Sequence, residues 1–262
     1  NALGENVLKL PLLLALATAF PGARISWVPG TSGNFYLRHQ LAPLVDGRIA
    51  EFITDLDIPT DPRSALFHRR PILARHFDLI VDTQRYFGRT VFLRRIPHRR
   101  FISGTWQYAL SNAAPPRGAP RRPPRLVDKL LGLAAAAAGR PIAVPNPIPI
   151  PPALRDSAGR LLPPGPRYVG LSPGAGNKEN GKCWPLDAFV ALARQQSERG
   201  RVPVFLLGPE EAEWYAPLRQ AVPQALFPEQ RETIADAIRG PSLTAALGER
   251  LSAAVANCSG AG

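Results

Sequence analysis

The residues best suited to chemistry follow two short apolar runs in the second half of the chain. Tyr168 to Leu171 leads directly into Ser172 and a turn of small residues, and Val202 to Leu207 leads into Gly208 and two carboxylates. Small residues let the backbone approach a ligand closely and expose its N–H groups. The polar and small residues near the two run ends are Ser172, Gly174, Gly176, Lys178, Lys182, Glu210 and Glu211. This set suits a ligand held by backbone amides and charged side chains.

A helix must connect the two runs and position these residues. Pro185 suits its first turn, and Gly200 suits its end. Apolar residues recur at helical spacing between them, at Leu186, Phe189, Leu192 and Ala193. Strand, loop, helix and strand form a parallel βαβ unit, and ligands of such units bind at the carboxyl ends of the strands.

The stretch from 168 to 213 resembles glycosyltransferase family 9, the heptosyltransferases of lipopolysaccharide assembly. Three motifs in order carry the resemblance: Pro173-Gly174-Ala175, Lys182-Cys183-Trp184-Pro185 and Gly208-Pro209-Glu210-Glu211. The resemblance implies an α/β fold of GT-B architecture, in which two Rossmann-like domains face a cleft. It extends more weakly over nearly the whole chain and implies an acceptor-binding first domain and a nucleotide-sugar-binding second domain.

Composition places the domain boundary in a proline-rich stretch. We expect an N-terminal Rossmann-like domain at 1–140, an extended linker at 141–166 and a C-terminal domain at 167–262. The family's leading strand is absent before Asn1 and its closing elements are absent after Gly262, so we expect a fragment truncated at both ends with an incomplete second domain. We expect residues 1–6 to form a polar turn and residues 7–20 to form one apolar helix. A secretory signal is the alternative for these twenty residues, but Glu5 precedes the apolar run and no basic segment does.

In the first half, residues 24–28 predict a strand, and residues 30–76 are expected to be irregular. Residues 77–81 predict a buried strand that ends at Asp82, with Gln84 and Arg85 just beyond it. The family has a similar pattern on the acceptor side, so the resemblance implies that these three residues bind the acceptor. Asp55 and Asp57 form a D-x-D triplet of the kind that holds a metal in other glycosyltransferases. Adjacent prolines favour a solvated turn instead, so we expect no metal site.

The chain departs from the family pattern at two positions. The family places its catalytic aspartate in the first loop, where this chain has Glu5, so the resemblance implies that Glu5 is the base; a simple helix cap is the alternative. The family's N-D-S-G run holds the nucleotide, and here it reads Asn257-Cys258-Ser259-Gly260. The resemblance thus assigns Cys258, Ser259 and Gly260 to the nucleotide, with cysteine in place of aspartate.

These assignments predict an inverting transfer without a metal or other cofactor. Lys182 and the backbone N–H groups would neutralise the departing diphosphate, and Glu210 would accept hydrogen bonds from the ribose. Glu5 would take the proton of the acceptor hydroxyl. The resemblance suggests ADP-heptose as the donor and a lipopolysaccharide or other cell-envelope glycan as the acceptor. A relative that binds a nucleotide sugar or glycan without turnover is the alternative.

Composition narrows the classes of partner. The chain has 262 residues, of which 45% are hydrophobic, and its net charge is +12. The positive charge suits an anionic glycolipid as partner and peripheral association with a membrane surface. A compositional bias toward arginine explains the charge equally well. Nucleic-acid binding would rest on charge alone, and we expect none. The chain has two cysteines, which fits a reducing compartment, and no apolar run long enough to span a membrane. The resemblance implies a bacterial cytoplasmic protein, at most peripheral on the inner face of the inner membrane.

Overall fold

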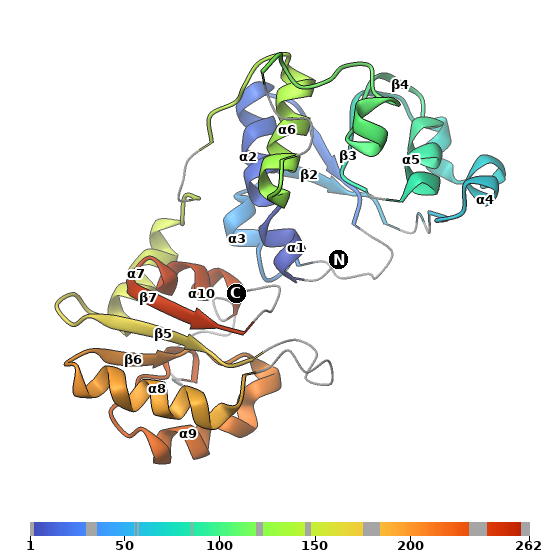
Figure 1. Cartoon of the computed structure of the whole chain (residues 1–262). Coiled ribbons are helices and arrows are strands. Elements are labelled where there is room, and N and C mark those ends of the chain that lie inside the picture. The colour runs from blue at the N-terminus through green and yellow to red at the C-terminus, as the bar shows by residue number, and fades with distance from the viewer. Residues whose placement is uncertain are drawn as a thin grey trace. The chain divides into compact units, whose positions relative to one another are not determined.

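The protein is described by a computed structural model in which two compact units are distinct (Figure 1). The described residues are 3–29, 36–54, 56, 58–84, 86–118, 123–144, 148–174, 184–230 and 240–257. The first unit comprises mainly Leu8–Phe35 and Val45–Ile148, and the second comprises Ala2–Val7, Tyr36–Leu44 and Pro149–Gly262. Each unit is considered on its own. Among the described residues, no helix is both long and apolar enough to cross a membrane.

The described strands of the first unit form two parallel pairs. Strand β1 (Ile25–Trp27) pairs with β2 (Ile49–Phe52), and β3 (Phe77–Asp82) pairs with β4 (His98–Ser103). The helices are α2 (Leu10–Ala19), α4 (Pro62–Phe67), α5 (Phe87–Arg94) and α6 (Leu126–Ala138), with 3-10 turns at Pro71–Ala74 and Thr105–Tyr108. The strands expected near 24–28 and 77–81 are confirmed, whereas β2 occupies a stretch that we expected to be irregular.

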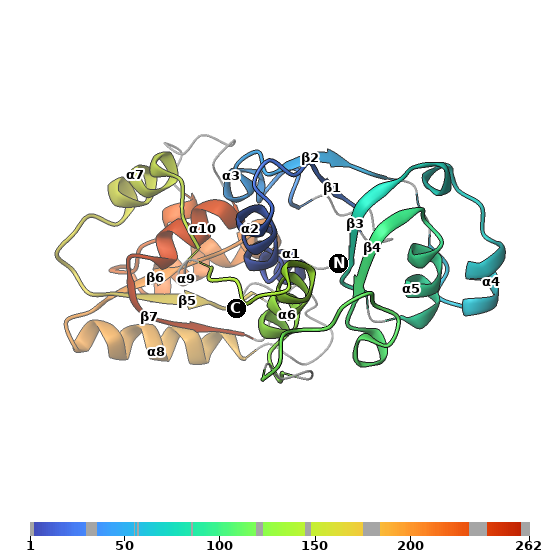
Figure 2. The ribbon, with the colours of Figure 1, turned by 90° about the horizontal axis from the view of Figure 1, so that it is seen from above.

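Helices cover both faces of the β3–β4 pair, as Figure 2 shows from above. One core joins Leu79, Val81 and Ile102 to apolar residues of α2 and α6. The other joins Ile80 and Phe101 to α4, α5 and the segments beside them. Because successive side chains of a strand point to opposite faces, the continuous apolar run of β3 serves both cores.

The second unit contains one parallel sheet of three described strands in the order β6-β5-β7. The strands are β5 (Tyr168–Ser172), β6 (Val202–Phe205) and β7 (Leu251–Ala256). The helices are α1 (Leu3–Val7), α7 (Pro152–Leu161), α8 (Leu186–Glu198), α9 (Tyr215–Ala221) and α10 (Pro241–Gly248); α3 (Ala42–Val45) crosses the sequence boundary between the units at residue 44. Further 3-10 turns lie at Pro209–Trp214 and Pro228–Gln230.

The predicted βαβ unit is confirmed as β5, α8 and β6. Phe189 and Ala193 of α8 are fully buried against Leu171 and Phe205 of the sheet. Gly200 follows the helix with φ of +69°, the left-handed conformation in which glycine ends helices without steric cost.

The prediction for the first twenty residues was wrong in detail. We expected a polar turn at 1–6 and one helix from 7 to 20, but α1 spans Leu3–Val7 and a new helix begins at Leu10. Pro11 lies in the first turn of α2, where its missing N–H is harmless, whereas a continuous helix would need that N–H and would clash with the ring. Glu5 therefore lies within a helix and not in a loop.

The extended conformation predicted for the linker at 141–166 was wrong over part of its length, because this stretch contains α7 at Pro152–Leu161. Pro152 occupies the first helical turn, and the next proline is Pro163, just after the helix. Leu154, Ala158 and Leu161 recur at helical spacing and are buried. The number of prolines thus suggested an extended chain, while their positions permit a ten-residue helix.

Candidate active site

The carboxyl ends of the three parallel strands in the second unit meet at one edge. The Leu206 N–H donates to Leu171 O at 2.9 Å, and the Asn257 N–H donates to Ser172 O at 3.2 Å. The loops after β5, β6 and β7 therefore begin side by side. This edge brings Ser172 and Gly174, both predicted to bind the nucleotide sugar, close to the Gly208 turn.

Glu211 links two of these loops. Its buried carboxylate accepts a hydrogen bond from the Gly208 N–H at 3.0 Å. A Cβ atom added at Gly174 would lie 2.6 Å from both Cδ and Oε1 of Glu211, so position 174 requires glycine for close approach. Glu210, the carboxylate predicted to bind ribose, is exposed at the same end of the sheet. The two adjacent glutamates thus differ in role, since Glu211 shapes the loop and Glu210 faces solvent.

Asn257 fixes two further segments, and sequence reasoning did not assign it. Its side chain is 6% exposed. The Nδ2 group donates to Pro173 O at 2.6 Å, and Oδ1 accepts from the Trp184 N–H at 2.7 Å. One side chain therefore holds the end of β5 and the approach to α8 together. The signal that could have identified it is its place at the start of the Asn257–Gly260 run.

The amino end of α8 adds an anion-binding element to this edge. The helix has 13 residues, and its N-cap, Pro185, makes no side-chain capping bond. Such a helix end carries partial positive charge and points backbone N–H groups outward. Trp184 is 47% exposed beside it and contacts Phe189 edge to face. The amino terminus of α8 therefore gives this edge of the sheet an element that can hold an anionic group such as a phosphate.

In the first unit, Asp82 lies at the carboxyl end of β3 but is only 1% exposed. Its Oδ2 accepts hydrogen bonds from Thr90 Oγ1 at 2.7 Å and from Ser103 Oγ at 2.8 Å. Its Oδ1 accepts from the Gln84 N–H at 2.8 Å. Burial raises the pKa of Asp82, and the hydrogen bonds oppose this shift. The Asp82 carboxylate thus links β3, β4 and α5, and it fixes the positions of Gln84, Thr90 and Ser103.

Gln84 is half-buried at the same strand end. Its Oε1 accepts a hydrogen bond from an Arg89 guanidinium nitrogen at 3.1 Å, and the guanidinium also lies 5.0 Å from the centre of the Tyr86 ring. The side-chain amide of Gln84, a predicted acceptor residue, and the guanidinium of Arg89 therefore lie together at this strand end.

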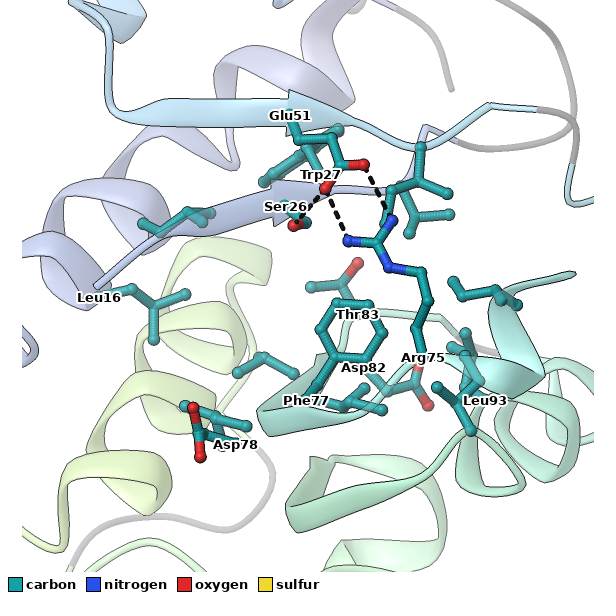
Figure 3. Close-up of a pocket in the computed structure, with 18 of the residues that line it drawn as sticks. Leu16, Ser26, Trp27, Glu51, Arg75, Phe77, Asp78, Asp82, Thr83 and Leu93 are labelled. Atoms are coloured by element: carbon teal, nitrogen blue, oxygen red, sulfur yellow. Dashed lines mark hydrogen bonds and ion pairs between the residues drawn. The ribbon is translucent and has the colours of Figure 1, made fainter.

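A cavity of about 1190 Å³ lies between the β1–β2 pair and the β3–β4 pair (Figure 3). Arg75 crosses this space and forms a bidentate ion pair with Glu51 of β2, with both contacts at 2.8 Å. Ser26 of β1 donates to the same carboxylate, and these partners lower the pKa of Glu51 to about 2. Much of the remaining wall is aliphatic, from Leu12, Leu13, Leu16, Leu56, Ile58, Leu93 and Ile96. Asp82, Thr83 and Gln84 also line it.

The structure describes only part of the predicted site. Glu5 is exposed on α1, in a segment that belongs to the second unit. Seven predicted residues lie outside the described residues: Arg85, Gly176, Lys178, Lys182, Cys258, Ser259 and Gly260. Asp55 and Asp57 of the D-x-D triplet also lie outside them. Within the described ranges, no group of three or more histidine, cysteine or acidic residues is placed to hold a metal ion.

The fold and the sequence both match known glycosyltransferases. A glycosyl transferase family 9 structure from Veillonella parvula is 17% identical, with a TM-score of 0.58, and the match covers 99% of this chain and 74% of that one. E. coli heptosyltransferase WaaC with ADP is 16% identical, with a TM-score of 0.59 and coverages of 99% and 79%. E. coli ADP-heptose lps heptosyltransferase II is 16% identical, with a TM-score of 0.54 and coverages of 98% and 76%.

These likenesses show an α/β fold of the GT-B class. No curated protein sequence matches the chain. The sequence pattern of glycosyltransferase family 9 (heptosyltransferase) matches residues 65–255, which cover most of both units. The chain therefore belongs to glycosyltransferase family 9, and it is a glycosyltransferase.

Proposed function

We propose that this protein transfers a heptose-like sugar from a nucleotide-diphosphate sugar to a lipopolysaccharide or other cell-envelope glycan, with inversion at the anomeric carbon. The observation that carries the proposal is the carboxyl edge of the β6-β5-β7 sheet. There the close approach of Gly174 to Glu211 and the Asn257 bridge hold the loops in place, and the amino end of α8 offers N–H groups to an anion.

The donor proposal follows from the chemistry of this edge. Departure of a nucleoside diphosphate leaves negative charge, which fixed N–H groups, a helix terminus and a lysine can stabilise without reorganisation. Lys182 is the proposed lysine, and Cys258, Ser259 and Gly260 complete the proposed nucleotide site. Two E. coli WaaC structures contain ADP and ADP-2-deoxy-2-fluoro heptose, which supports ADP-heptose as the donor here. The reaction needs no metal or cofactor if these groups carry the charge.

We assign the acceptor to the carboxyl end of β3, where Gln84 and Arg89 offer an amide and a cation and where Arg85 follows in sequence. The net charge of +12 supports an anionic glycolipid and peripheral contact with the inner face of the inner membrane. Glu5 is the proposed base. An exposed carboxylate reaches an incoming hydroxyl, removes its proton and allows its oxygen to attack the anomeric carbon as the diphosphate departs.

The test compares Glu5→Gln and Glu5→Asp with the parent. Sugar transfer from ADP-heptose and ADP-heptose affinity are measured for all three forms. Glu5→Gln should lose transfer while its affinity for ADP-heptose stays within a few-fold, and Glu5→Asp should retain measurable transfer. Transfer by Glu5→Gln at the parental rate would remove Glu5 from the mechanism. Tight ADP-heptose binding by a parent that transfers nothing would favour a binding relative without turnover, as Cys258 in place of the family's aspartate would suggest.

A further inference from the structure

The turn after β4 has a backbone conformation that side-chain-bearing residues rarely adopt. Trp106, Gln107 and Tyr108 have φ values of +47°, +55° and +71°. In this left-handed region the Cβ atom crowds the following carbonyl oxygen, so three consecutive non-glycine residues there are strained. Such strain persists only where the surroundings hold it, and it concentrates at functional sites.

The ends of this turn are held firmly. The Ser103 N–H donates to Ser111 Oγ at 2.6 Å, and the Ser111 hydroxyl donates to Ser103 O at 2.7 Å. Further out, two residues before Ser103 and one residue after Ser111, the Phe101 N–H donates to Asn112 Oδ1 and the Asn112 N–H donates to Phe101 O. These reciprocal bonds close the loop on β4. Tyr108, the last strained residue, is buried.

The network around Asp82 fixes the same turn to the neighbouring strand and helix. Asp82 accepts from Ser103 at the start of the turn and from Thr90 of α5. Thr90 Oγ1 in turn lies 2.9 Å from Thr105 Oγ1, one residue before Trp106. Through Ser103, Thr90 and Thr105, the buried carboxylate therefore helps to set the position of Trp106.

The strained turn presents a large aromatic surface. Trp106 is 64% exposed and lies flat on Phe87, with ring centroids 4.2 Å apart and an interplanar angle of 14°. Tyr86, next to Phe87, is 58% exposed. Tryptophan is usually well buried, so an exposed indole held by a strained backbone indicates a contact surface. Tyr86, Phe87 and Trp106 are called the aromatic ledge below.

The ledge lies at the carboxyl ends of β3 and β4, beside groups that suit a charged sugar. Arg89 lies over the Tyr86 ring and bonds to Gln84. One face of a pyranose ring carries mainly C–H bonds and packs on a flat aromatic ring, while its hydroxyls reach amides at the edge. A guanidinium attracts a phosphate or carboxylate on the same glycan.

We propose that the aromatic ledge binds one sugar ring of an anionic acceptor glycan, with Trp106 under the C–H face of the ring and Arg89 beside the anionic substituent. This inference rests on the proposed function, because it deepens the acceptor side of that reaction. It also explains why a buried aspartate is found at the predicted acceptor position: Asp82 supports the turn that carries the ledge.

The test uses a phosphorylated oligosaccharide obtained by removing the acyl chains of lipopolysaccharide, so that membrane binding cannot contribute. Its dissociation constant is measured by calorimetry for the parent, Trp106→Gly, Trp106→Phe and Phe67→Ala. Glycine adopts positive φ without strain, so Trp106→Gly removes the indole and leaves the backbone free to keep its shape. Phe67, 83% exposed on α4, is the control for loss of an exposed aromatic.

Trp106→Gly should weaken oligosaccharide binding about 10-fold or more, as loss of a central aromatic contact does elsewhere. Trp106→Phe should stay within about 3-fold of the parent, since it keeps a ring. Phe67→Ala should match the parent, and ADP affinity should be equal in all four forms. Parental binding by Trp106→Gly would overturn the ledge while leaving sugar transfer by the parent intact.

Two further outcomes would overturn the proposal. In the first, the parent binds ADP but not the oligosaccharide, which would also remove this acceptor class from the proposed function. In the second, Trp106→Gly keeps oligosaccharide binding but loses binding to vesicles of phosphatidylglycerol and phosphatidylcholine, which would make the ledge a membrane contact.

Discussion

Replacement of Gly174 by alanine should act through Glu211, to which the three nearest atoms belong. The added Cβ would lie 2.6 Å from Cδ and Oε1 of Glu211, well inside van der Waals contact. The backbone at 174 does not lie in the left-handed region, so alanine is acceptable there in conformation. The carboxylate must therefore move, and its 3.0 Å bond to the Gly208 N–H must break.

The energetic consequence can be estimated from these two contacts. A hydrogen bond to a charged group contributes about 1.5–3 kcal/mol, and overpacking costs about 1–3 kcal/mol. Gly174→Ala should therefore destabilise the second unit by about 2.5–6 kcal/mol. In a Glu211→Ala background the obstacle is gone, so the same substitution should cost about 0 kcal/mol, which gives a coupling energy of about 2 kcal/mol or more.

Hydrogen exchange of the β5 amides under native conditions reports the opening free energy of this unit without assuming that the whole chain unfolds in one step. The four forms of the cycle are compared with Gly248→Ala, a control in α10 where an added Cβ meets nothing within 4 Å. Equal cost of Gly174→Ala in both backgrounds would refute the argument that Glu211 is what excludes a side chain at 174.

Three further predictions concern charge and hydrogen bonding. Lys182→Ala should lower kcat/KM by about 10²-fold or more, because the lysine's charge acts as the diphosphate departs. If Lys178→Ala loses activity while Lys182→Ala keeps nearly all of it, Lys178 has the role assigned to Lys182. Asn257→Asp keeps an acceptor for the Trp184 N–H but loses the donor to Pro173 O, so ADP affinity should fall at neutral pH. The affinity should recover in acid, because the protonated carboxyl becomes a donor. An ADP affinity that does not depend on pH would contradict the role of Asn257 as a bridge between the two segments. Glu51 has a folded pKa of about 2 against an ordinary 4.5, so its contribution to stability is present above pH 4.5 and is lost as the pH falls toward 2. Glu51→Gln should therefore weaken the acid dependence of first-unit stability in that window, and an unchanged pH profile would count against the Arg75 ion pair.

The sequence predicted the central βαβ unit well because each local signal agreed with the fold. The apolar run of β5, the spacing of apolar residues in α8 and the glycine at 200 all indicate the same arrangement. The same holds for β3, whose apolar run ends at Asp82. The strand ends predicted in this way lie at one edge of the sheet in the structure, and the residues proposed for the site in the second unit follow them.

Other features depend on contacts that local sequence does not contain. Glu210 and Glu211 are chemically identical neighbours, and only the packing of Gly174 decides which one is buried. Asp82 looks like a ligand-binding carboxylate until the hydroxyls of Thr90 and Ser103 are found beside it. The left-handed turn at Trp106 contains no glycine, so no local signal predicts it.

The most direct test of the account follows the anomeric proton of the transferred sugar by NMR while ADP release is measured in parallel, with ADP-heptose, a lipopolysaccharide-derived acceptor and excess EDTA. Inverting transfer without a metal predicts one ADP released for each sugar transferred, a product of opposite anomeric configuration, and a rate unaffected by EDTA. Retained configuration, or loss of activity in EDTA that a divalent metal restores, would contradict the proposed single displacement by residues of this chain alone.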